Sequence, residues 1–176
     1  MARSTGNRGV TSPTKNQHTP KTLLFLCTGN YYRSRFAEIL FNDVSERTGL
    51  AWRAYSRGLA IEMGVNNVGP ISAAVAERLA ALGIATDGYL RMPMQVCRDD
   101  LERADHVVAL KEDEHRPLLM ARHPAWQDRV EYWHVDLDFA PVEEALREIE
   151  RRIRPSRPGW PACEIRRTIN HVWPHN

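Results

Sequence analysis

The feature that most constrains this chain is an apolar run that ends in a short polar loop and continues as a helix. Leu23 to Leu26 form a continuous apolar stretch, and apolar residues recur at helical spacing from Phe36 onward. Such a run is typical of a strand that is covered on both faces of a parallel sheet. The loop between them, residues 27–34, must curl tightly, and Gly29 and Asn30 tolerate the backbone dihedrals that a tight curl requires. We therefore expect strand, loop and helix in succession.

This loop, named here the phosphate loop (residues 27–34), has the side chains needed to bind and attack a tetrahedral oxyanion. In a curled loop at a helix N-terminus, backbone N–H groups point inward and form a nest for an anion. Cys27 would lie among those donors and near Arg33, which favours the nucleophilic thiolate. The planar guanidinium of Arg33 can hold two phosphoryl oxygens, and Ser34 can cap the helix or donate to sulfur. The expected phosphate-binding residues are Thr28, Gly29, Asn30, Tyr31, Tyr32 and Ser34.

The Cys-x5-Arg spacing alone also fits a buried structural cysteine and an unrelated surface arginine, because cysteine is among the residues most often buried. The surrounding pattern favours catalysis. A strand precedes the loop, a helix follows it, and Gly-Asn and Arg-Ser pairs occupy it. A motif in its expected structural context is far more specific than its spacing alone.

Charge and hydropathy exclude several classes of partner. The 176 residues carry a net charge of +2, and basic and acidic side chains are interspersed beyond the first segment. This distribution predicts neither nucleic-acid binding nor membrane association. No apolar stretch approaches the ~18 residues of a membrane-spanning helix, and the N-terminus lacks the apolar centre of a secretory signal. We expect a cytoplasmic protein, and the sequence does not indicate an oligomeric state.

The cysteines and histidines do not indicate a metal site. Cys27, Cys97 and Cys163 are too widely spaced for a disulfide framework or a Cys-x2-Cys metal motif. The histidines, including His115, are scattered, and we interpret them as ordinary partly buried or surface residues. We expect reduced thiols, no metal and no cofactor.

The chain divides into three parts. Residues 1–21 are rich in small, polar and basic side chains and contain no acidic residue, so we expect a disordered tail. Residues 22–153 carry the alternating strand and helix patterns of one folded domain. Residues 154–176 form a proline-rich C-terminal extension in which 163–173 fit a short helix.

Strand and helix patterns alternate four times in the folded domain. Apolar runs predict strands at 23–27, 51–56, 106–110 and 130–135, and helical periodicity predicts helices at 34–47, 70–82, 98–103, 112–121 and 141–153. Met92 and Met94, in an irregular segment, are expected to fill gaps in the core. The alternation predicts an α/β fold, a three-layer sandwich around a four-stranded parallel sheet.

A second catalytic group is expected at the same edge of the sheet as the phosphate loop. In open parallel sheets, ligands bind outside the carboxyl ends of the strands, where Asp136 and Asp138 follow the fourth strand. Phosphoryl transfer to sulfur leaves an alkoxide or phenoxide that needs a proton, and one carboxyl group can donate it and later activate water. Both aspartates are candidates, and we favour Asp136. The alternative is that both only solvate the loop or cap the next helix.

Together these features resemble the low-molecular-weight protein tyrosine phosphatases over residues 22–153. The matches are Leu-Phe-Leu-Cys-Thr-Gly-Asn before the bend, Arg33-Ser34 after it, Ala37-Glu38, Ser56-x-Gly58 and Ala104-Asp105. The resemblance implies a Rossmann-like sheet of the phosphotyrosine protein phosphatase I type. It also implies Cys27 as the nucleophile that forms a cysteinyl-phosphate, Arg33 as the clamp and Asp136 as the acid. Asn30 and Ser34 would shape the loop and stabilise the thiolate, and Ser56 would support it. The implied substrate is a phosphorylated protein or a small aryl phosphate.

Some positions depart from the family pattern. Tyr32 stands where a second cysteine usually precedes the arginine, so a protective disulfide is not expected. Arg35 replaces a common proline and is expected to add charge at the pocket mouth. The usual Asp-Pro and aromatic residues are replaced by Asp-Leu-Asp-Phe at 136–139, which leaves Tyr31 and Phe139 as substitutes for an aromatic wall.

Three alternatives remain open from the sequence. An arsenate reductase of the same fold needs two further cysteines for a disulfide relay, and Cys97 and Cys163 are not placed just after the third strand. A phosphoarginine phosphatase fits Thr28, whereas the bulk of Tyr31 opposes it. A non-catalytic phosphate-binding module would not need the nucleophile.

Overall fold

The structure is a computed structural model that describes residues 19–136 and 141–154. Its centre is a four-stranded sheet in the order β2-β1-β3-β4, and each neighbouring pair is parallel. The strands are β1 (Lys21–Cys27), β2 (Trp52–Gly58), β3 (His106–Ala109) and β4 (Glu131–Tyr132). The predicted α/β class and parallel sheet are confirmed.

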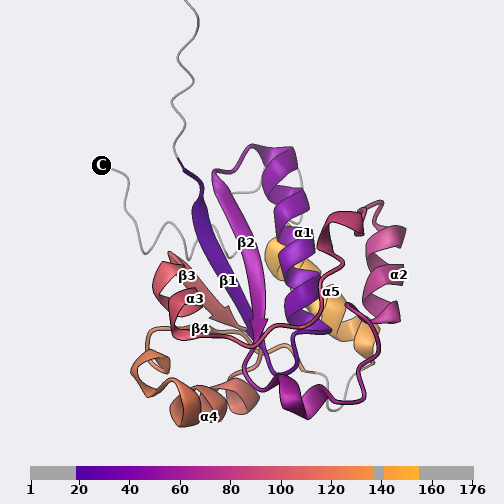
Figure 1. The fold of residues 1–176 in the computed structure, drawn as a ribbon. Helices are drawn as coiled ribbons and strands as arrows, with labels where there is room; N and C mark the ends of the chain where they lie inside the picture. The colour runs from indigo at the N-terminus through magenta and orange to yellow at the C-terminus, as the bar shows by residue number, and fades with distance from the viewer. Residues whose placement is uncertain (1–18, 137–140, 155–176) are drawn as a thin grey trace, which may run out of the picture.

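Helices cover both faces of the sheet and complete the three layers (Figure 1). One face is covered by α1 (Arg33–Thr48), α2 (Ala73–Ala81) and α5 (Val142–Ile153). The other face is covered by α3 (Arg98–Arg103) and α4 (Glu112–Arg122). Three short 3-10 turns lie in the connections: η1 (Ile61–Gly64), η2 (Asp87–Tyr89) and η3 (Pro124–Trp126).

Strand β1 belongs to both hydrophobic cores, as its continuous apolar run predicts. Leu23 and Phe25 pack in the core beneath α1 and α5, while Leu24 and Leu26 pack in the core on the α3 and α4 side. All four side chains are fully buried, and such burial contributes about 1.5–3 kcal/mol for each one. The carboxyl end of β1, where Cys27 lies, is therefore held on both faces.

Strand β2 is an edge strand whose outward backbone groups are used by side chains. The Asn42 side chain donates to the Ala54 carbonyl at 3.0 Å and accepts from the Ala54 N–H at 2.7 Å. Ser45 donates to the Trp52 carbonyl at 2.6 Å. Exposed edge groups invite pairing with another chain, so these contacts protect the edge.

The fourth strand is shorter than the sequence predicts. It has only Glu131 and Tyr132, because the next carbonyl, that of Trp133, accepts from the first N–H of α4 at 3.1 Å. The chain nevertheless stays beside β3, since the Val135 N–H donates to the Leu110 carbonyl at 2.9 Å. The direction of residues 130–135 is as predicted, but the ladder is interrupted.

Two local expectations are wrong. The second helix begins at Ala73 rather than Pro70, because Ser72 is extended (φ −62°, ψ 142°). Met92 and Met94 do not fill the core, because their side chains are 61% and 43% exposed.

The tail at 1–18, the loop at 137–140 and the extension at 155–176 lie outside the described residues. The expected disorder of the tail and the expected C-terminal helix therefore remain predictions. Among residues 19–136 and 141–154, no helix is both long and apolar enough to cross a bilayer.

Candidate active site

The phosphate loop curls between β1 and α1 around an asparagine in the left-handed conformation. Asn30 has φ +51°, whereas Gly29 is not among the glycines with positive φ. A Cβ at Gly29 would lie 3.4 Å from the Asn67 side chain, an ordinary van der Waals contact, so space around the loop does not by itself require a glycine there. The curl is as predicted, but Asn30 rather than Gly29 supplies the unusual dihedral.

The nucleophile candidate has a hydroxyl beside it. Cys27 is 3% exposed, and its Sγ lies 2.9 Å from the Ser34 Oγ. Ser34 Oγ in turn accepts from the Asn30 side-chain amide at 3.0 Å. Because that oxygen already receives a hydrogen bond, its own hydrogen is available to the sulfur. The Ser34 hydroxyl is therefore placed to donate a hydrogen bond to the Cys27 sulfur.

Asn30 is the centre of the network behind the loop. Its amide nitrogen also donates to the Ser56 hydroxyl at 2.9 Å. Its carbonyl oxygen accepts from Arg91 Nη1 and from the Met94 N–H, each at 3.0 Å. Every polar atom of the Asn30 side chain is therefore engaged, and the side chain is fully buried. The structure places Ser56 beside the loop, where the resemblance implies a supporting residue.

A buried charge cluster lies behind Ser56. One oxygen of Glu38 accepts from Ser56 at 2.6 Å, from Arg35 at 2.8 Å and from Arg91 at 3.0 Å. Arg35 is fully buried and also donates to the Tyr89 carbonyl. The expectation that Arg35 adds charge at the pocket mouth is therefore wrong: Glu38 draws this side chain into the interior. Burial lowers the pKa of Arg91, which the carboxylate of Glu38 partly offsets.

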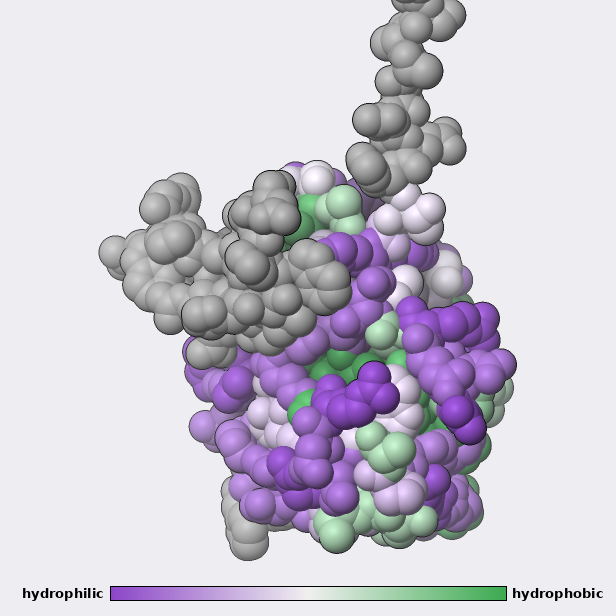
Figure 2. Space-filling model, turned by 90° about the vertical axis from the view of Figure 1, so that its left-hand side faces the viewer, coloured by the Kyte–Doolittle hydropathy of each residue, from purple (hydrophilic) through white to green (hydrophobic). Residues whose placement is uncertain are grey.

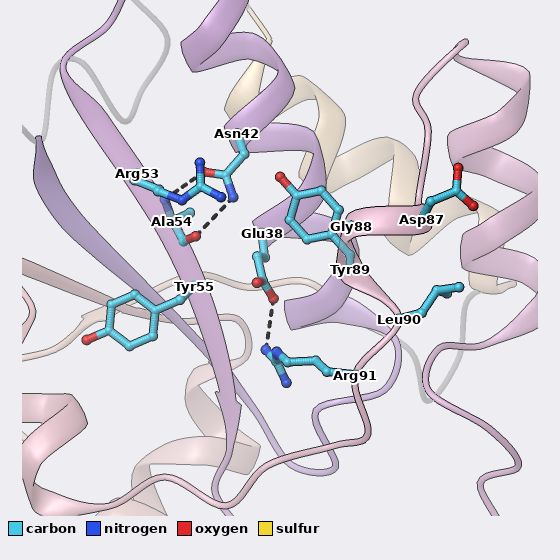
Figure 3. Close-up of a pocket in the computed structure, with 10 residues that line it drawn as sticks. All are labelled: Glu38, Asn42, Arg53, Ala54, Tyr55, Asp87, Gly88, Tyr89, Leu90 and Arg91. Carbon is cyan, nitrogen blue, oxygen red and sulfur yellow. Dashed lines mark hydrogen bonds and ion pairs between the residues drawn. The ribbon is translucent and has the colours of Figure 1, made fainter.

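The same cluster borders a pocket of about 400 Å³ between α1, β2 and the segment from η2 to Arg91 (Figure 3). In this view the Glu38 carboxylate meets the Arg91 guanidinium, and Asn42 reaches the backbone of Ala54. Cys27 and Arg33 are not among its lining residues. The pocket therefore lies behind the phosphate loop and gives access to its supporting residues.

Arg33 forms a two-pronged ion pair with a residue that the sequence analysis did not identify. Its Nη1 and Nη2 atoms lie 2.8 Å from the Oε2 and Oε1 atoms of Glu114. The Thr28 hydroxyl donates to the same carboxylate. Glu114 follows β3, so its place at the carboxyl edge of the sheet was the available signal. The Glu114 carboxylate therefore links Thr28 to Arg33.

Glu114 stays charged although it is partly buried. Burial would raise its pKa, but contacts with His115, Arg33 and Thr28 outweigh this effect and hold the pKa well below the usual range. His115 is fully buried, its Nδ1 accepts from the Lys111 N–H at 3.0 Å, and its Nε2 lies 3.6 Å from Glu114 Oε1. Burial lowers the pKa of His115. The expectation of an ordinary partly buried or surface histidine is wrong for His115.

Asp136 is at the same edge of the sheet as Cys27. The N–H of its neighbour Val135 donates to the Leu110 carbonyl at 2.9 Å, and the Leu110 N–H donates to the Leu26 carbonyl at 3.0 Å. Adjacent strands lie about 4.8 Å apart, so the backbones of 136 and 27 are separated by about two strand spacings. Asp136 forms an ion pair with Lys111 at 3.0 Å and is half exposed. Asp138 lies outside the described residues.

The expected aromatic wall is not formed by Tyr31. This side chain is 7% exposed, its hydroxyl donates to the Val68 carbonyl at 2.6 Å, and its ring packs edge-on against Tyr32 at 4.9 Å. Phe139 lies outside the described residues. Exposed aliphatic side chains of the neighbouring connection, Met63, Val65 and Val68, add apolar surface near the loop. Figure 2 shows one face of the molecule, with apolar side chains scattered among polar ones.

The geometry places a thiol, a guanidinium and a carboxylate at one edge of the sheet. Cys27 lies within reach of a hydroxyl donor, and Arg33 is fixed by a carboxylate. Asp136 forms an ion pair with the ammonium group of Lys111. A phosphoryl group bound at this edge would be attacked by sulfur and polarised by the guanidinium.

Comparison with known proteins agrees with this reading. A family model described as low molecular weight phosphotyrosine protein phosphatase matches residues 22–150. The protein tyrosine phosphatase YfkJ of Bacillus subtilis is 33% identical over 90 residues, which cover 51% of this chain and 55% of YfkJ. That alignment thus spans little more than half of the relative.

Two solved structures share the fold over most of their length. A low molecular weight protein tyrosine phosphatase from T. tengcongensis is 27% identical with a TM-score of 0.59, covering 74% of this chain and 90% of that one. The YwlE arginine phosphatase from Geobacillus stearothermophilus is 23% identical with a TM-score of 0.62, covering 89% of this chain and 99% of that one. The second likeness concerns the fold alone.

Proposed function

The chain belongs to the low molecular weight phosphotyrosine protein phosphatase family, and from this premise we propose that it hydrolyses phosphotyrosine in proteins through a cysteinyl-phosphate intermediate. The observation that carries the proposal is the contact of 2.9 Å between Cys27 Sγ and Ser34 Oγ, beside a guanidinium held in place. A phosphate-binding module needs the guanidinium and the nest of N–H groups, but it needs no activated thiol.

The proposed reaction has two steps. In the first, the Cys27 thiolate attacks phosphorus, the bond from phosphorus to the tyrosine oxygen breaks, and Asp136 gives its proton to the leaving phenolate. In the second, Asp136 removes a proton from water, the water oxygen bonds to phosphorus, and the bond from sulfur to phosphorus breaks. The products are tyrosine and inorganic phosphate, and the thiolate is restored. Arg33 stabilises the equatorial oxygens in both steps.

Phosphoarginine hydrolysis is the second candidate, because one neighbour of the same fold is an arginine phosphatase. Thr28 was the residue that favoured it. Here the Thr28 hydroxyl donates to Glu114, so this hydrogen is not offered to a substrate. The Tyr31 ring is buried and packs against Tyr32, so its bulk does not distinguish the two substrates. The contact of Thr28 with Glu114 removes the feature that favoured phosphoarginine, and this supports a phosphotyrosine substrate.

Arsenate reduction has less support. The Cys97 thiol donates to Asp100 at 3.2 Å at the start of α3, where it serves as a helix cap. Cys163 lies outside the described residues. We propose a phosphorylated protein or a small aryl phosphate as substrate, and the cytoplasm as the compartment, where thiols stay reduced.

The proposed function is tested with p-nitrophenyl phosphate and a phosphotyrosyl peptide. We expect turnover of both, its loss in Cys27→Ser, and unchanged turnover in the control Cys97→Ser. A phosphoarginine peptide serves as the comparison substrate. Tight binding of phosphotyrosine without release of phosphate would refute the enzymatic proposal. Faster hydrolysis of the phosphoarginine peptide than of the phosphotyrosyl peptide would make phosphoarginine the favoured substrate.

A further inference from the structure

We propose that Glu114 is the positioning residue of the phosphate clamp: it holds the Arg33 guanidinium by one edge so that another edge faces the phosphoryl group. This inference rests on the proposed function of the phosphate loop. It adds to the site a residue of α4 that lies 81 positions after Arg33 in the sequence.

The contact between Glu114 and Arg33 fixes orientation as well as distance. Both terminal nitrogens of the guanidinium lie 2.8 Å from a carboxylate oxygen. A two-pronged contact of this kind keeps the two planar groups in register, whereas a single hydrogen bond lets the guanidinium turn. Arg33 is 6% exposed, so water competes little for these donors.

Glu114 and a phosphoryl group need not compete for the same edge of Arg33. A guanidinium has five N–H donors in a rigid plane. The carboxylate engages one hydrogen on each terminal nitrogen, so the Nε hydrogen and the second hydrogen of Nη2, which form the side edge, are not used in this contact. That side edge presents two parallel donors, which suit two phosphoryl oxygens. The ion pair can therefore persist while substrate is bound.

Glu114 also joins the two ends of the loop. The Thr28 hydroxyl, next to the nucleophile, donates to Glu114 Oε1, and Arg33 closes the loop on the same carboxylate. A misplacement of about 1 Å in a catalytic group can slow a reaction by roughly 100-fold. A carboxylate that links nucleophile and clamp guards against such a displacement.

The surroundings of Glu114 keep it in the ionised form that this role needs. It is the third residue of α4, where the helix dipole favours negative charge. Behind it, the fully buried His115 directs Nε2 toward Glu114 Oε1 at 3.6 Å. The backbone contact of His115 with the Lys111 N–H fixes that ring. The His115 ring therefore packs beside the same carboxylate oxygen that Arg33 Nη2 contacts.

The rival reading is that Glu114 occupies the place of the substrate phosphate in the empty enzyme and is displaced on binding. The two readings predict opposite effects of removing its charge. A positioning carboxylate, once neutralised, leaves Arg33 poorly oriented, so oxyanions bind more weakly. A displaced placeholder, once neutralised, ceases to compete, so oxyanions bind more tightly.

The experiment measures equilibrium binding of orthovanadate to the full-length protein, together with kcat and KM for p-nitrophenyl phosphate. We expect Glu114→Gln to weaken vanadate binding and lower kcat, each by roughly 10- to 100-fold. Glu114→Asp keeps the charge and should recover part of both losses. Asp113→Asn removes the same charge from the same helix turn at an exposed position, and it should change neither by more than about twofold. Unchanged or tighter vanadate binding in Glu114→Gln would overturn the proposal.

A double-mutant cycle tests whether Glu114 acts through Arg33. In an Arg33→Ala background, Glu114→Gln should produce no further loss of vanadate affinity, whereas an equal further loss would show a merely structural role. If Glu114→Gln does not fold, Glu114→Asp carries the comparison, and wild-type affinity in that variant overturns the proposal. Vanadate binding by a wild-type protein that shows no turnover would reject the proposed function and leave the test of Glu114 intact.

Discussion

The side-chain amide of Asn30 donates to the Ser56 hydroxyl at 2.9 Å, so the curl of the phosphate loop is held by the neighbouring strand β2. Asn30 adopts φ +51°, a conformation that is uncommon outside glycine. The hydrogen bond to Ser56 therefore stabilises the loop in the conformation that brings Ser34 to Cys27. The phosphate loop therefore depends on Ser56, which follows Asn30 by 26 positions.

Removal of the Ser56 hydroxyl should impair both stability and catalysis. Ser56→Ala deletes the acceptor of Asn30 and the donor to Glu38, and we expect a loss of about 1–3 kcal/mol in the free energy of unfolding. We also expect kcat for p-nitrophenyl phosphate to fall roughly tenfold through the loosened loop. Ser45→Ala, which loses hydrogen bonds to the Leu50 and Trp52 carbonyls, is the matched control. It should lose stability without loss of kcat, and equal kcat in the two variants would contradict the role of Ser56.

Replacement of the clamp by lysine should lower both affinity and rate. Arg33→Lys keeps a positive charge but has no planar fork for two phosphoryl oxygens or for the carboxylate of Glu114. We expect kcat/KM to fall by roughly 100-fold or more. Arg116→Lys, on the outside of α4 and paired with Glu112, should be close to wild type. Steady-state kinetics of both variants measures kcat/KM. An equal decrease in kcat/KM in Arg33→Lys and Arg116→Lys would contradict the role of Arg33.

The dependence of kcat on the leaving group should identify the general acid. Asp136→Ala is expected to slow phenyl phosphate and alkyl phosphates more than p-nitrophenyl phosphate, because a good leaving group needs less protonation. The measurement is kcat for the three substrates in wild type, Asp136→Ala and Asp138→Ala. Full activity in the first variant together with loss in the second would reassign the acid to Asp138.

Acid should destabilise the protein through His115. Burial lowers the pKa of His115 in the folded state, whereas the unfolded chain has a value of about 6.5. Below about pH 6.5, the unfolded chain therefore binds a proton at His115 that the folded protein does not bind. The free energy of unfolding is highest above this pH and decreases as the pH falls, by at most about 1.4 kcal/mol per pH unit for one group.

His115→Asn keeps an acceptor for the Lys111 N–H and does not titrate, so its stability should depend less on pH between 7.5 and about 5. Urea unfolding at several pH values compares it with wild type. His134→Asn, at an exposed position, is the control and should keep the wild-type slope. An identical slope in His115→Asn and wild type would contradict the assignment.

The stability of the edge strand β2 should depend on the side-chain amide of Asn42. Asn42→Ala removes both hydrogen bonds to Ala54 and leaves a buried N–H and carbonyl without them. We expect a loss of roughly 2–4 kcal/mol in the free energy of unfolding and a greater tendency to aggregate. Asp43→Ala, which loses an ion pair with Arg47 on the helix surface, should cost under about 1 kcal/mol. Denaturant unfolding and light scattering measure both effects, and equal losses would contradict the edge role of Asn42.

The parts of the fold that the sequence predicts are those governed by neighbouring residues. A continuous apolar run and a short loop require β1, the curl and α1, because the run must be buried and the loop has no length for another path. Regular alternation of strand and helix then gives the parallel sheet. From the sheet it follows that Cys27 and Asp136 lie at one edge, since ligands bind where parallel strands end.

Local patterns were misleading where a distant partner changes the surroundings of a side chain. Arg35 reads as a surface charge, yet Glu38 and the Tyr89 carbonyl hold it in the interior. Met92 and Met94 read as core residues, yet they are exposed, because the chain there is held to the loop by the Arg91 side chain and the Met94 N–H.

By itself, the sequence determined which residues could attack and bind a phosphoryl group, because Cys27, Arg33 and Ser34 are brought together by a single tight loop. Only the tertiary structure decided what holds them. Glu114 is 81 positions from Arg33, and Arg91 is 61 positions from Asn30. Pairing over such separations is set by how β3 packs beside β1 and how the segment before α3 packs beside the end of β2, and nothing within the loop encodes it. The chemistry of the site is therefore local in sequence, whereas its precision depends on the packing of the whole sheet.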